Sequence, residues 1–275
     1  SGNERPVKFD VPVLNYNGEI VHSLAKWKRA ALKQYDFHVG NGLYADMNAI
    51  RRDEELDNLH SIYVDQWDWE RVISREQRSL DYLKETVQNL VNAIAETSSR
   101  LHTKYPKVET VIDTNVSFIT SQELIDLYPN LTAKERENVY VKEHPTTFIL
   151  QIGDILSHGE PHDQRAPDYD DWSLNGDLLF WHEPLGCAME LSSMGIRVDD
   201  KALLTQLEKA NANDRLAYPF HQQILNNELP LTIGGGIGQS RMCMLLLSKV
   251  HIGEVQVSLW DEETLNACKD KVFLL

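Results

Sequence analysis

Two pairs of strand-like segments with short connections constrain the fold of this chain most strongly. The first pair covers residues 42–50 and 59–69, and the second covers residues 174–181 and 187–198. Parallel strands need a crossover of a dozen or more residues, whereas antiparallel strands can be joined directly, so the short connections predict antiparallel pairing. We therefore expect an antiparallel sheet at the centre of the chain.

The other periodic segments indicate how this sheet is covered. Apolar residues at helical spacing predict a long amphipathic helix over residues 75–101. Shorter helices are expected at 24–35 (after an N-cap at Ser23), 121–128, 132–142, 199–210, 215–228 and 239–247, and further strands at 7–14, 116–119 and 146–152. Helices that come in blocks, without strict alternation with strands, favour an α+β fold with a mostly antiparallel sheet flanked by helices over a doubly wound sheet.

Composition narrows the class of protein. The chain has 275 residues, 42% of them apolar, which is enough for one sizeable core, and no repeat or flexible linker divides it. We expect a single domain over residues 1–275. No apolar run is long enough to cross a membrane. With 27 Lys and Arg against 42 Asp and Glu, the net charge of −15 argues against general nucleic-acid binding.

The cysteines indicate the cellular compartment of the protein, and the first residues bear on whether the sequence includes the natural N-terminus. Cys187, Cys243 and Cys268 show no CxxC spacing and cannot all pair, so we expect a reducing, cytoplasmic setting. The start at Ser1, Gly2 and Asn3 resembles neither a natural beginning nor a cap. We expect the first residues of the protein to be missing.

A glycine-rich stretch, residues 234–238, is the most distinctive local feature, and Ser240 and Arg241 follow it closely. We expect it to form a turn that leads into the helix at 239–247. Such a turn lets a backbone approach a ligand, the helix N-terminus offers free N–H groups to an anion, and Arg241 could reach a phosphate. A plain glycine turn is the alternative. Too few residues follow for a Rossmann fold, and the Lys of a Walker A loop is absent.

The charged connection at residues 51–55 is a second candidate for phosphate binding. An arginine at the end of a strand, such as Arg51, can hold a phosphate with two hydrogen bonds, although a solvated hairpin tip is the more common meaning of such a run. The following strand carries Asp65, Gln66 and Asp68 on both of its faces. Buried polar side chains need partners, so this strand is expected to line a polar pocket.

Two further groups carry carboxylates. The run from Arg165 to Trp172 could recognise an amino group and a carboxylate, or could be a solvated loop. Asp177 and Glu190 lie on the two paired strands and could share a Mg²⁺ ion, which prefers carboxylate and phosphate oxygens, or could simply be exposed.

The motifs at residues 22–29, 59–70, 165–172, 190–198 and 234–241, in this order, closely resemble those of the ammonia-dependent asparagine synthetases, the type A aspartate–ammonia ligases. The resemblance covers the chain from about residue 1 to the C-terminus. It implies the catalytic fold of class II aminoacyl-tRNA synthetases, in a homodimer. It also implies that L-aspartate, ATP and ammonia give L-asparagine, AMP and pyrophosphate through a β-aspartyl-adenylate.

The resemblance also implies roles for individual residues. Arg51, with Asp53, resembles the class II arginine that holds the α-phosphate, and Arg241 resembles the one at the γ-phosphate end. Asp177 and Glu190 look like the Mg²⁺ ligands, and Gly236 completes the ATP site. The aspartate pocket would contain Ser23, Lys28, Gln66, Asp68, Arg165, Asp170 and Ser193. In it Lys28 would hold the reacting carboxylate, and Asp68 or Asp170 would take a proton from ammonium.

Some alternatives remain open at this stage. Members of the family begin some tens of residues earlier, with a segment that contributes to the dimer interface and reaches the substrate. An aminoacyl-tRNA synthetase core and a binding-only relative are the alternative functions. Glutamine-dependent amide transfer normally uses a cysteine nucleophile, but Cys187 lies in an apolar strand, so free ammonia is the expected nitrogen donor.

Overall fold

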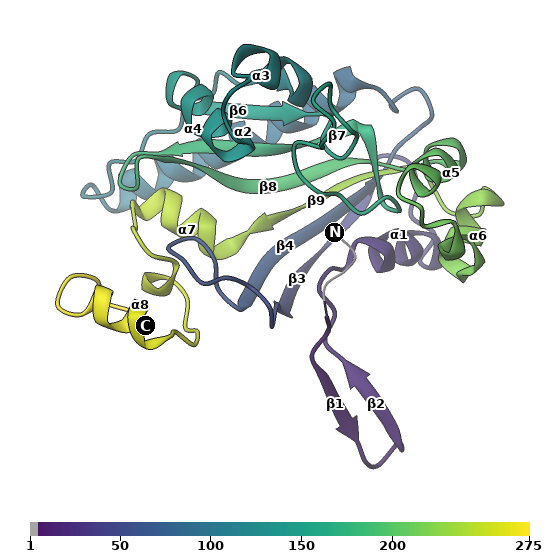
Figure 1. Ribbon diagram of the computed structural model, residues 1–275, viewed down its shortest axis with the longest axis horizontal. Helices are drawn as coiled ribbons and strands as arrows, with labels where there is room; N and C mark the ends of the chain where they lie inside the picture. The colour runs from purple at the N-terminus through teal and green to yellow at the C-terminus, as the bar shows by residue number, and fades with distance from the viewer. Residues whose placement is uncertain (1–4) are drawn as a thin grey trace.

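A seven-stranded sheet runs through the centre of the computed structural model, which describes residues 5–275 (Figure 1). Its pairs are antiparallel except for one parallel pair at the edge, between β5 and β6. The spatial order is β3 (Gly42–Ile50), β4 (Tyr63–Val72), β9 (Thr232–Gly238), β8 (Cys187–Arg197), β7 (Asp170–His182), β6 (Thr146–Leu150) and β5 (Ser117–Thr120). The predicted α+β class and the two antiparallel pairs are confirmed.

One face of the sheet is covered by α2 (Leu80–Lys104) and α7 (Gln239–Leu247). The apolar side of α2, including Leu83, Val87 and Val91, packs against β7 and β8 in the main core. The helix begins at residue 80 rather than at the expected 75, because the side chain of Ser79 caps it by accepting a hydrogen bond from the backbone N–H of Tyr82.

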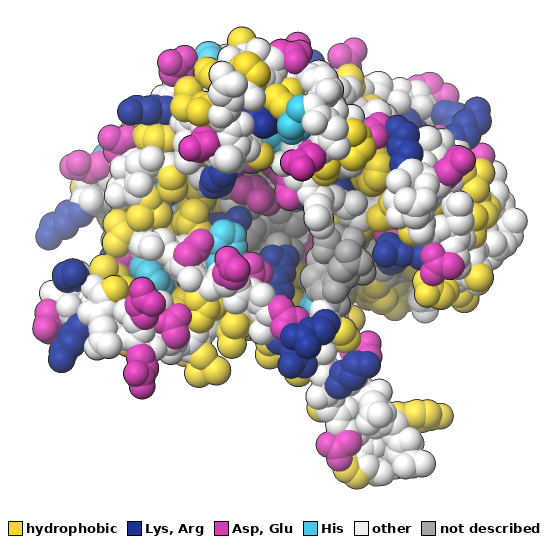
Figure 2. Space-filling view, in the orientation of Figure 1, with side chains coloured by type: hydrophobic (Ala, Val, Ile, Leu, Met, Phe, Trp, Pro, Cys, Tyr) yellow, Lys and Arg dark blue, Asp and Glu magenta, His cyan; other side chains and the backbone are white. Residues whose placement is uncertain are grey.

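Helices cover the two ends of the opposite face and leave its middle open. At one end lie α3 (Ser121–Leu127) and α4 (Ala133–Glu143), and each begins with a capping box. At the other end lie α1 (Ala25–Gln34), α5 (Asp200–Lys209), the 3₁₀ turn η1 (Asn213–Ala217) and α6 (Pro219–Leu225). The space-filling view shows a hollow between these parts, with acidic and basic side chains inside it (Figure 2).

Several expected elements have different bounds in the structure. The expected strand at 7–14 is a hairpin of β1 (Lys8–Val11) and β2 (Tyr16–Glu19), which extends from the body (Figure 1). The expected helix at 215–228 is split, since Pro219 can begin a helix but cannot continue one. The helix after Ser23 takes Leu24 as its N-cap. The short elements η2 (Ile252–Glu254) and α8 (Glu262–Cys268) were not expected from the sequence.

The glycine-rich stretch is a strand and not the expected turn. Residues 234–238 pair with β4 on one side and β8 on the other, as part of β9. Side chains of both neighbours need the space that glycine leaves: a Cβ atom on Gly236 would lie 2.7 Å from the side-chain oxygen of Gln66, and one on Gly234 would lie 2.6 Å from Arg197 Nη2. The glycines therefore allow close packing of the polar side chains on both neighbouring strands. Among residues 5–275, no helix is long and apolar enough to cross a membrane.

Candidate active site

A cavity of about 720 Å³ opens on the uncovered part of the sheet, a volume typical of ligand sites. The strands β4, β8 and β9 form its floor, and the segments around residues 51–54 and 163–170 form its walls. Apart from Lys28 and Asp177, every site residue predicted from the sequence lines it, namely Ser23, Arg51, Asp53, Gln66, Asp68, Arg165, Asp170, Glu190, Ser193, Gly236 and Arg241.

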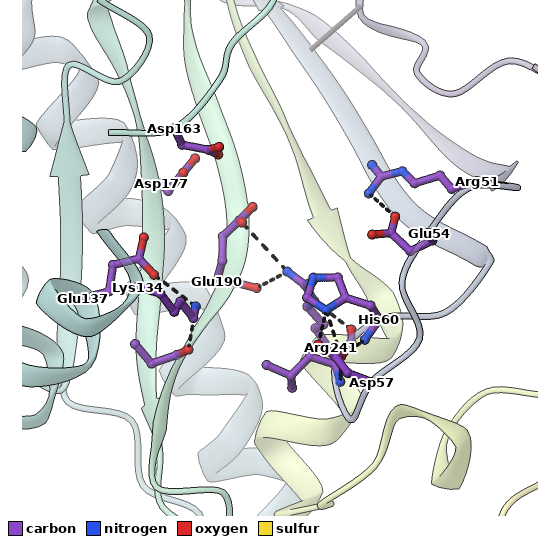
Figure 3. Close-up of polar contacts among 12 residues, drawn as sticks. Arg51, Glu54, Asp57, His60, Lys134, Glu137, Asp163, Asp177, Glu190 and Arg241 are labelled. Carbon is purple, nitrogen blue, oxygen red and sulfur yellow. Dashed lines mark hydrogen bonds and ion pairs between the residues drawn. The ribbon is translucent and has the colours of Figure 1, made fainter. Parts of the chain in front are cut away.

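Two arginines from different elements face this cavity. Arg51 follows the last residue of β3, and its Nη1 lies 3.7 Å from Glu54 Oε2. Arg241 lies in the first turn of α7, where its Nη1 donates a hydrogen bond to the backbone oxygen of Glu190 (2.9 Å) and lies 3.9 Å from Glu190 Oε2 (Figure 3). Neither guanidinium has a close, two-pronged carboxylate partner in the described chain. Both arginines are thus available to an anionic ligand.

The N-terminus of α7 is not free for such an anion, contrary to the expectation from the sequence. The carboxylate of Asp65 accepts hydrogen bonds from the backbone N–H of Ser240 (3.2 Å) and from its hydroxyl (2.9 Å). A side-chain carboxylate already occupies this helix end. Phosphate binding at this place would therefore depend on Arg241 and not on the first-turn N–H of Ser240.

A buried network of charges lies behind the cavity floor. The ammonium group of Lys28, whose side chain is 0% exposed, contacts the carboxylate of Asp68 and donates to the backbone oxygen of Trp69 (3.0 Å). Glu70 lies between Lys28 (3.9 Å) and Arg197 (3.1 Å). Burial and the nearby Arg197 lower the pKa of Lys28, while Glu70 and Asp68 oppose this change. Lys28 does not line the cavity itself, but it contacts Asp68, which does.

Arg197 is a cavity residue that the sequence analysis missed. It is 4% exposed, forms ion pairs with both Asp170 and Glu70, and lines the cavity. The available signal was its position in the apolar strand at 187–198, because a charge buried in a sheet must have partners. His22 and His60 also line the cavity and were not singled out, whereas Arg52 and Glu54, which line it too, belong to the charged connection at residues 51–55.

A β-bulge brings Glu190 to the same face as Asp177. The pairing of β7 with β8 jumps from Leu178 opposite Ser192 to Leu179 opposite Glu190, so Leu191 is an extra residue. Such a bulge shifts the alternation of side chains by one position. The side chain of Leu191 accordingly packs in the main core. The side chain of Glu190 instead points towards Arg241, which lines the cavity (Figure 3).

Asp177 lies just behind the cavity wall, where it pairs with Arg165. Burial raises the pKa of Asp177 to about 7; the Arg165 guanidinium opposes this rise and the Glu190 carboxylate adds to it. One of its oxygens, Oδ1, is buried and has no hydrogen-bond partner among residues 5–275. Within these residues there is no cluster of three or more acidic, histidine or cysteine side chains that could hold a metal ion.

The wall that carries Arg165 and Asp170 is anchored by Asp168, a buried residue between them. Its Oδ2 accepts hydrogen bonds from Lys26 Nζ on α1 (2.7 Å) and interacts with His221 Nε2 on α6 (3.0 Å). Burial opposes ionisation of this carboxyl group, but the hydrogen bonds from His221 and Lys26 outweigh it and hold the pKa of Asp168 well below its usual range.

We expect Asp168→Ala to lower the free energy of unfolding by about 3 kcal/mol at pH 7, because it leaves the charged and polar partners of Asp168 unpaired. A carboxyl group with a depressed pKa stabilises the fold fully above its unfolded pKa of about 4. This stabilisation is lost progressively as the pH falls from that value through the lower pKa of the folded state. Urea unfolding at several pH values should show the full difference at pH 5 and a narrowing difference below pH 4. Asp154→Ala removes an exposed partner of Lys209 and should cost less than about 1 kcal/mol. Equal losses of unfolding free energy in Asp168→Ala and Asp154→Ala would contradict the proposal that Asp168 anchors the cavity wall.

Comparison with known proteins places the chain in a family. The family model for aspartate–ammonia ligase matches residues 1–272. The chain belongs to the aspartate–ammonia ligase family. It is 58% identical over 272 residues to the aspartate–ammonia ligase of Clostridium tetani, covering 98% of this chain and 80% of that protein. It is 57% identical over 269 residues to the aspartate–ammonia ligase of Bacillus mycoides, covering 98% and 82%.

Solved structures confirm the expected class II fold. Asparaginyl-tRNA synthetase from Pyrococcus horikoshii, complexed with asparaginyl-adenylate, superposes with a TM-score of 0.66 at 15% identity, over 92% of this chain and 58% of that chain. The asparaginyl-tRNA synthetase of Entamoeba histolytica, also with asparaginyl-adenylate, gives 0.65 at 15% identity, over 91% and 58%. At this identity the likeness shows the fold alone.

Proposed function

We propose that this cavity catalyses the ATP-dependent amidation of L-aspartate by ammonia, which yields L-asparagine, AMP and pyrophosphate through a β-aspartyl-adenylate. The observation that carries the proposal is that Arg51 and Arg241 reach one cavity from two different elements. The lining of the same cavity includes Asp68 and Asp170, the carboxylates of two buried ion pairs. Membership of the aspartate–ammonia ligase family supplies the reaction to which this arrangement is suited.

In the first step, an oxygen of the substrate β-carboxylate attacks the α-phosphorus of ATP, and pyrophosphate leaves. Negative charge accumulates around the α-phosphorus in the transition state. Arg51 and Arg241 stabilise this charge at positions that the fold fixes in advance, with Asp53 and Gly236 completing the ATP site. Because hydroxide-like oxygen is a poor leaving group, this activation is required before nitrogen can attack.

Asp177 and Glu190 are the residues that would hold Mg²⁺. They suit the ion because they lie on adjacent strands on one face, and because Asp177 Oδ1 is a buried acceptor without a partner in the described chain. Mg²⁺ commonly takes one or two carboxylates together with phosphate oxygens, so a larger set of protein ligands is not needed. When bound, the ion would supply positive charge to the phosphates of ATP.

The substrate aspartate would occupy the part of the cavity lined by Ser23, Gln66, Asp68, Arg165, Asp170 and Ser193. A zwitterionic amino acid needs both anionic and cationic partners, and this part supplies them. We propose that Lys28 acts by holding Asp68 in place, since its ammonium group is enclosed by Asp68, Glu70 and the Trp69 carbonyl group. The direct contact between Lys28 and the reacting carboxylate stays a prediction.

In the second step, ammonium gives a proton to a carboxylate, and the resulting ammonia attacks the acyl carbon of the adenylate. AMP leaves, and loss of a further proton from nitrogen gives the amide. Of the two candidate carboxylates, we propose Asp170 as the proton acceptor. Burial raises its pKa, with Arg197 opposing the rise, and a raised pKa makes a carboxylate a stronger base.

The test is pyrophosphate exchange into ATP, driven by L-aspartate with Mg²⁺, followed by addition of ammonium. We expect exchange, then asparagine and AMP in equal amounts, and loss of both activities when EDTA removes the metal. Tight binding of aspartate or AMP without exchange would contradict the proposal and favour a binding-only protein. Binding of tRNA in a gel shift, with aminoacylation, would favour a synthetase core instead.

We also propose that the chain forms one catalytic domain and acts as a homodimer in the cytoplasm. Large apolar side chains near the C-terminus, such as Val257, Leu259 and Phe273, are more than 70% exposed within the described chain and suit an interface. Light scattering after gel filtration should give twice the chain mass of 31.5 kDa.

A further inference from the structure

The first turn of α7 holds the phosphate-facing Arg241, yet the helix lacks a cap of its own. Its N-cap residue is Gly238, which has no side chain to cap the helix, and the first turn contains no acidic residue. Free N–H groups at a helix start are usually satisfied by an oxygen from a nearby side chain. Some other part of the chain must therefore supply this oxygen.

Asp65, on the neighbouring strand β4, supplies it. Both carboxylate oxygens of Asp65 accept from the hydroxyl of Ser240 (2.9 Å each), and Oδ1 also accepts from the Ser240 backbone N–H (3.2 Å). Ser240 is 3% exposed and directly precedes Arg241. The carboxylate therefore fixes the backbone from which the Arg241 side chain starts.

Gln256 closes this arrangement from the C-terminal segment. Its amide nitrogen donates to Ser240 Oγ (2.9 Å) and to Asp65 Oδ1 (3.3 Å), and the residue is 5% exposed. The amide cannot be reversed, because its oxygen would then face the Asp65 carboxylate. Three segments distant in sequence thus meet at one serine of the first turn.

We propose that Asp65 and Gln256 are positioning residues for adenylation, which act by fixing the first turn of α7 and, through it, the direction of Arg241. This inference rests on the proposed function, since it assigns Arg241 to the phosphates of ATP. Preorganised charge is effective only where the group is held in place before reaction, and a displacement of 1 Å can cost a hundredfold in rate.

Asp65→Ala provides the first test. We expect kcat/KM for ATP in pyrophosphate exchange to fall roughly 10- to 100-fold, with KM for aspartate changed by less than about twofold. Asp46→Ala is the matched control, because the exposed Asp46 accepts from the side chain of Gln239 (3.2 Å) at the same helix end but lies outside the cavity lining. We expect Asp46→Ala to keep the wild-type values. Unchanged ATP kinetics in Asp65→Ala would overturn the proposal.

A double-mutant cycle separates positioning from direct contact. In an Arg241→Met background, Asp65→Ala is expected to leave the dissociation constant of ATP unchanged, as measured by equilibrium dialysis, because the residue through which Asp65 acts is gone. A further loss of ATP affinity in that background would mean that Asp65 touches the nucleotide itself, and would overturn the inference. Full activity of Arg241→Met alone would instead contradict the role of Arg241 in the proposed function.

Ser240→Ala is a second variant that tests the same proposal, and it can be used if the Asp65→Ala protein does not fold. It removes the hydroxyl that Asp65 and Gln256 share but leaves both of these residues and the backbone N–H in place. We expect a smaller fall in kcat/KM for ATP, about 3- to 10-fold, that disappears in the Arg241→Met background. A fall that persists in that background would overturn the inference.

Discussion

Arg241→Ala is expected to lower the rate of aspartate-driven pyrophosphate exchange by roughly 100- to 1,000-fold. Removing one preorganised donor that faces developing negative charge commonly costs this much. The side chain of Arg241 is 20% exposed, and its strongest hydrogen bond goes to the Glu190 backbone oxygen, so its removal leaves no buried carboxylate unpaired. The fold should therefore survive, and a thermal melt of the variant would verify this.

The control for this prediction is Arg100→Ala, which removes an exposed arginine from α2 on the far side of the main core. It should keep wild-type exchange. Full activity in Arg241→Ala would remove Arg241 from the ATP site. An equal loss in both variants would indicate a general effect of net charge rather than a local one.

Lys28→Met is expected to lower the free energy of unfolding by about 3–5 kcal/mol, which corresponds to a fall of roughly 10 °C in the midpoint of thermal unfolding. The substitution leaves Asp68 and Glu70 buried without their ammonium partner, and the loss of one member of a buried ion pair is far costlier than the loss of both. Aspartate-driven exchange should also be lost, since Asp68 lines the cavity.

Lys33→Met tests whether burial is the cause. Lys33 lies on the same helix and pairs with Glu228 (3.2 Å), but both side chains are more than 40% exposed. The expected cost is below about 1 kcal/mol, because water screens an exposed pair. Comparable destabilisation in the two lysine variants, measured by urea unfolding, would contradict the account of the buried network.

Many of the residues that line the cavity could be named from the sequence because they break the local pattern, whereas Ser23 and Ser193 were named only through the family resemblance. Asp68 and Glu190 interrupt apolar strands, and Arg51 stands at a strand end. A polar or charged side chain in an apolar sheet is costly to bury without a partner, so each of these residues predicts an ion-pair partner or a ligand. Arg197 shows the limit of this approach, since its two carboxylate partners come from residues 27 and 127 positions away in the chain.

Local sequence alone determined most helices and strands of this protein, because turn lengths, caps and apolar periodicity act between residues close in the chain. The antiparallel pairs, the helix α4, which begins after its N-cap residue Thr132, and the long helix α2 follow from such signals. Only the tertiary structure made a strand of residues 234–238, turned Glu190 towards the cavity through the bulge at Leu191, and placed Asp65 on the end of α7. These features depend on strand register and on contacts between distant segments, which no local pattern encodes.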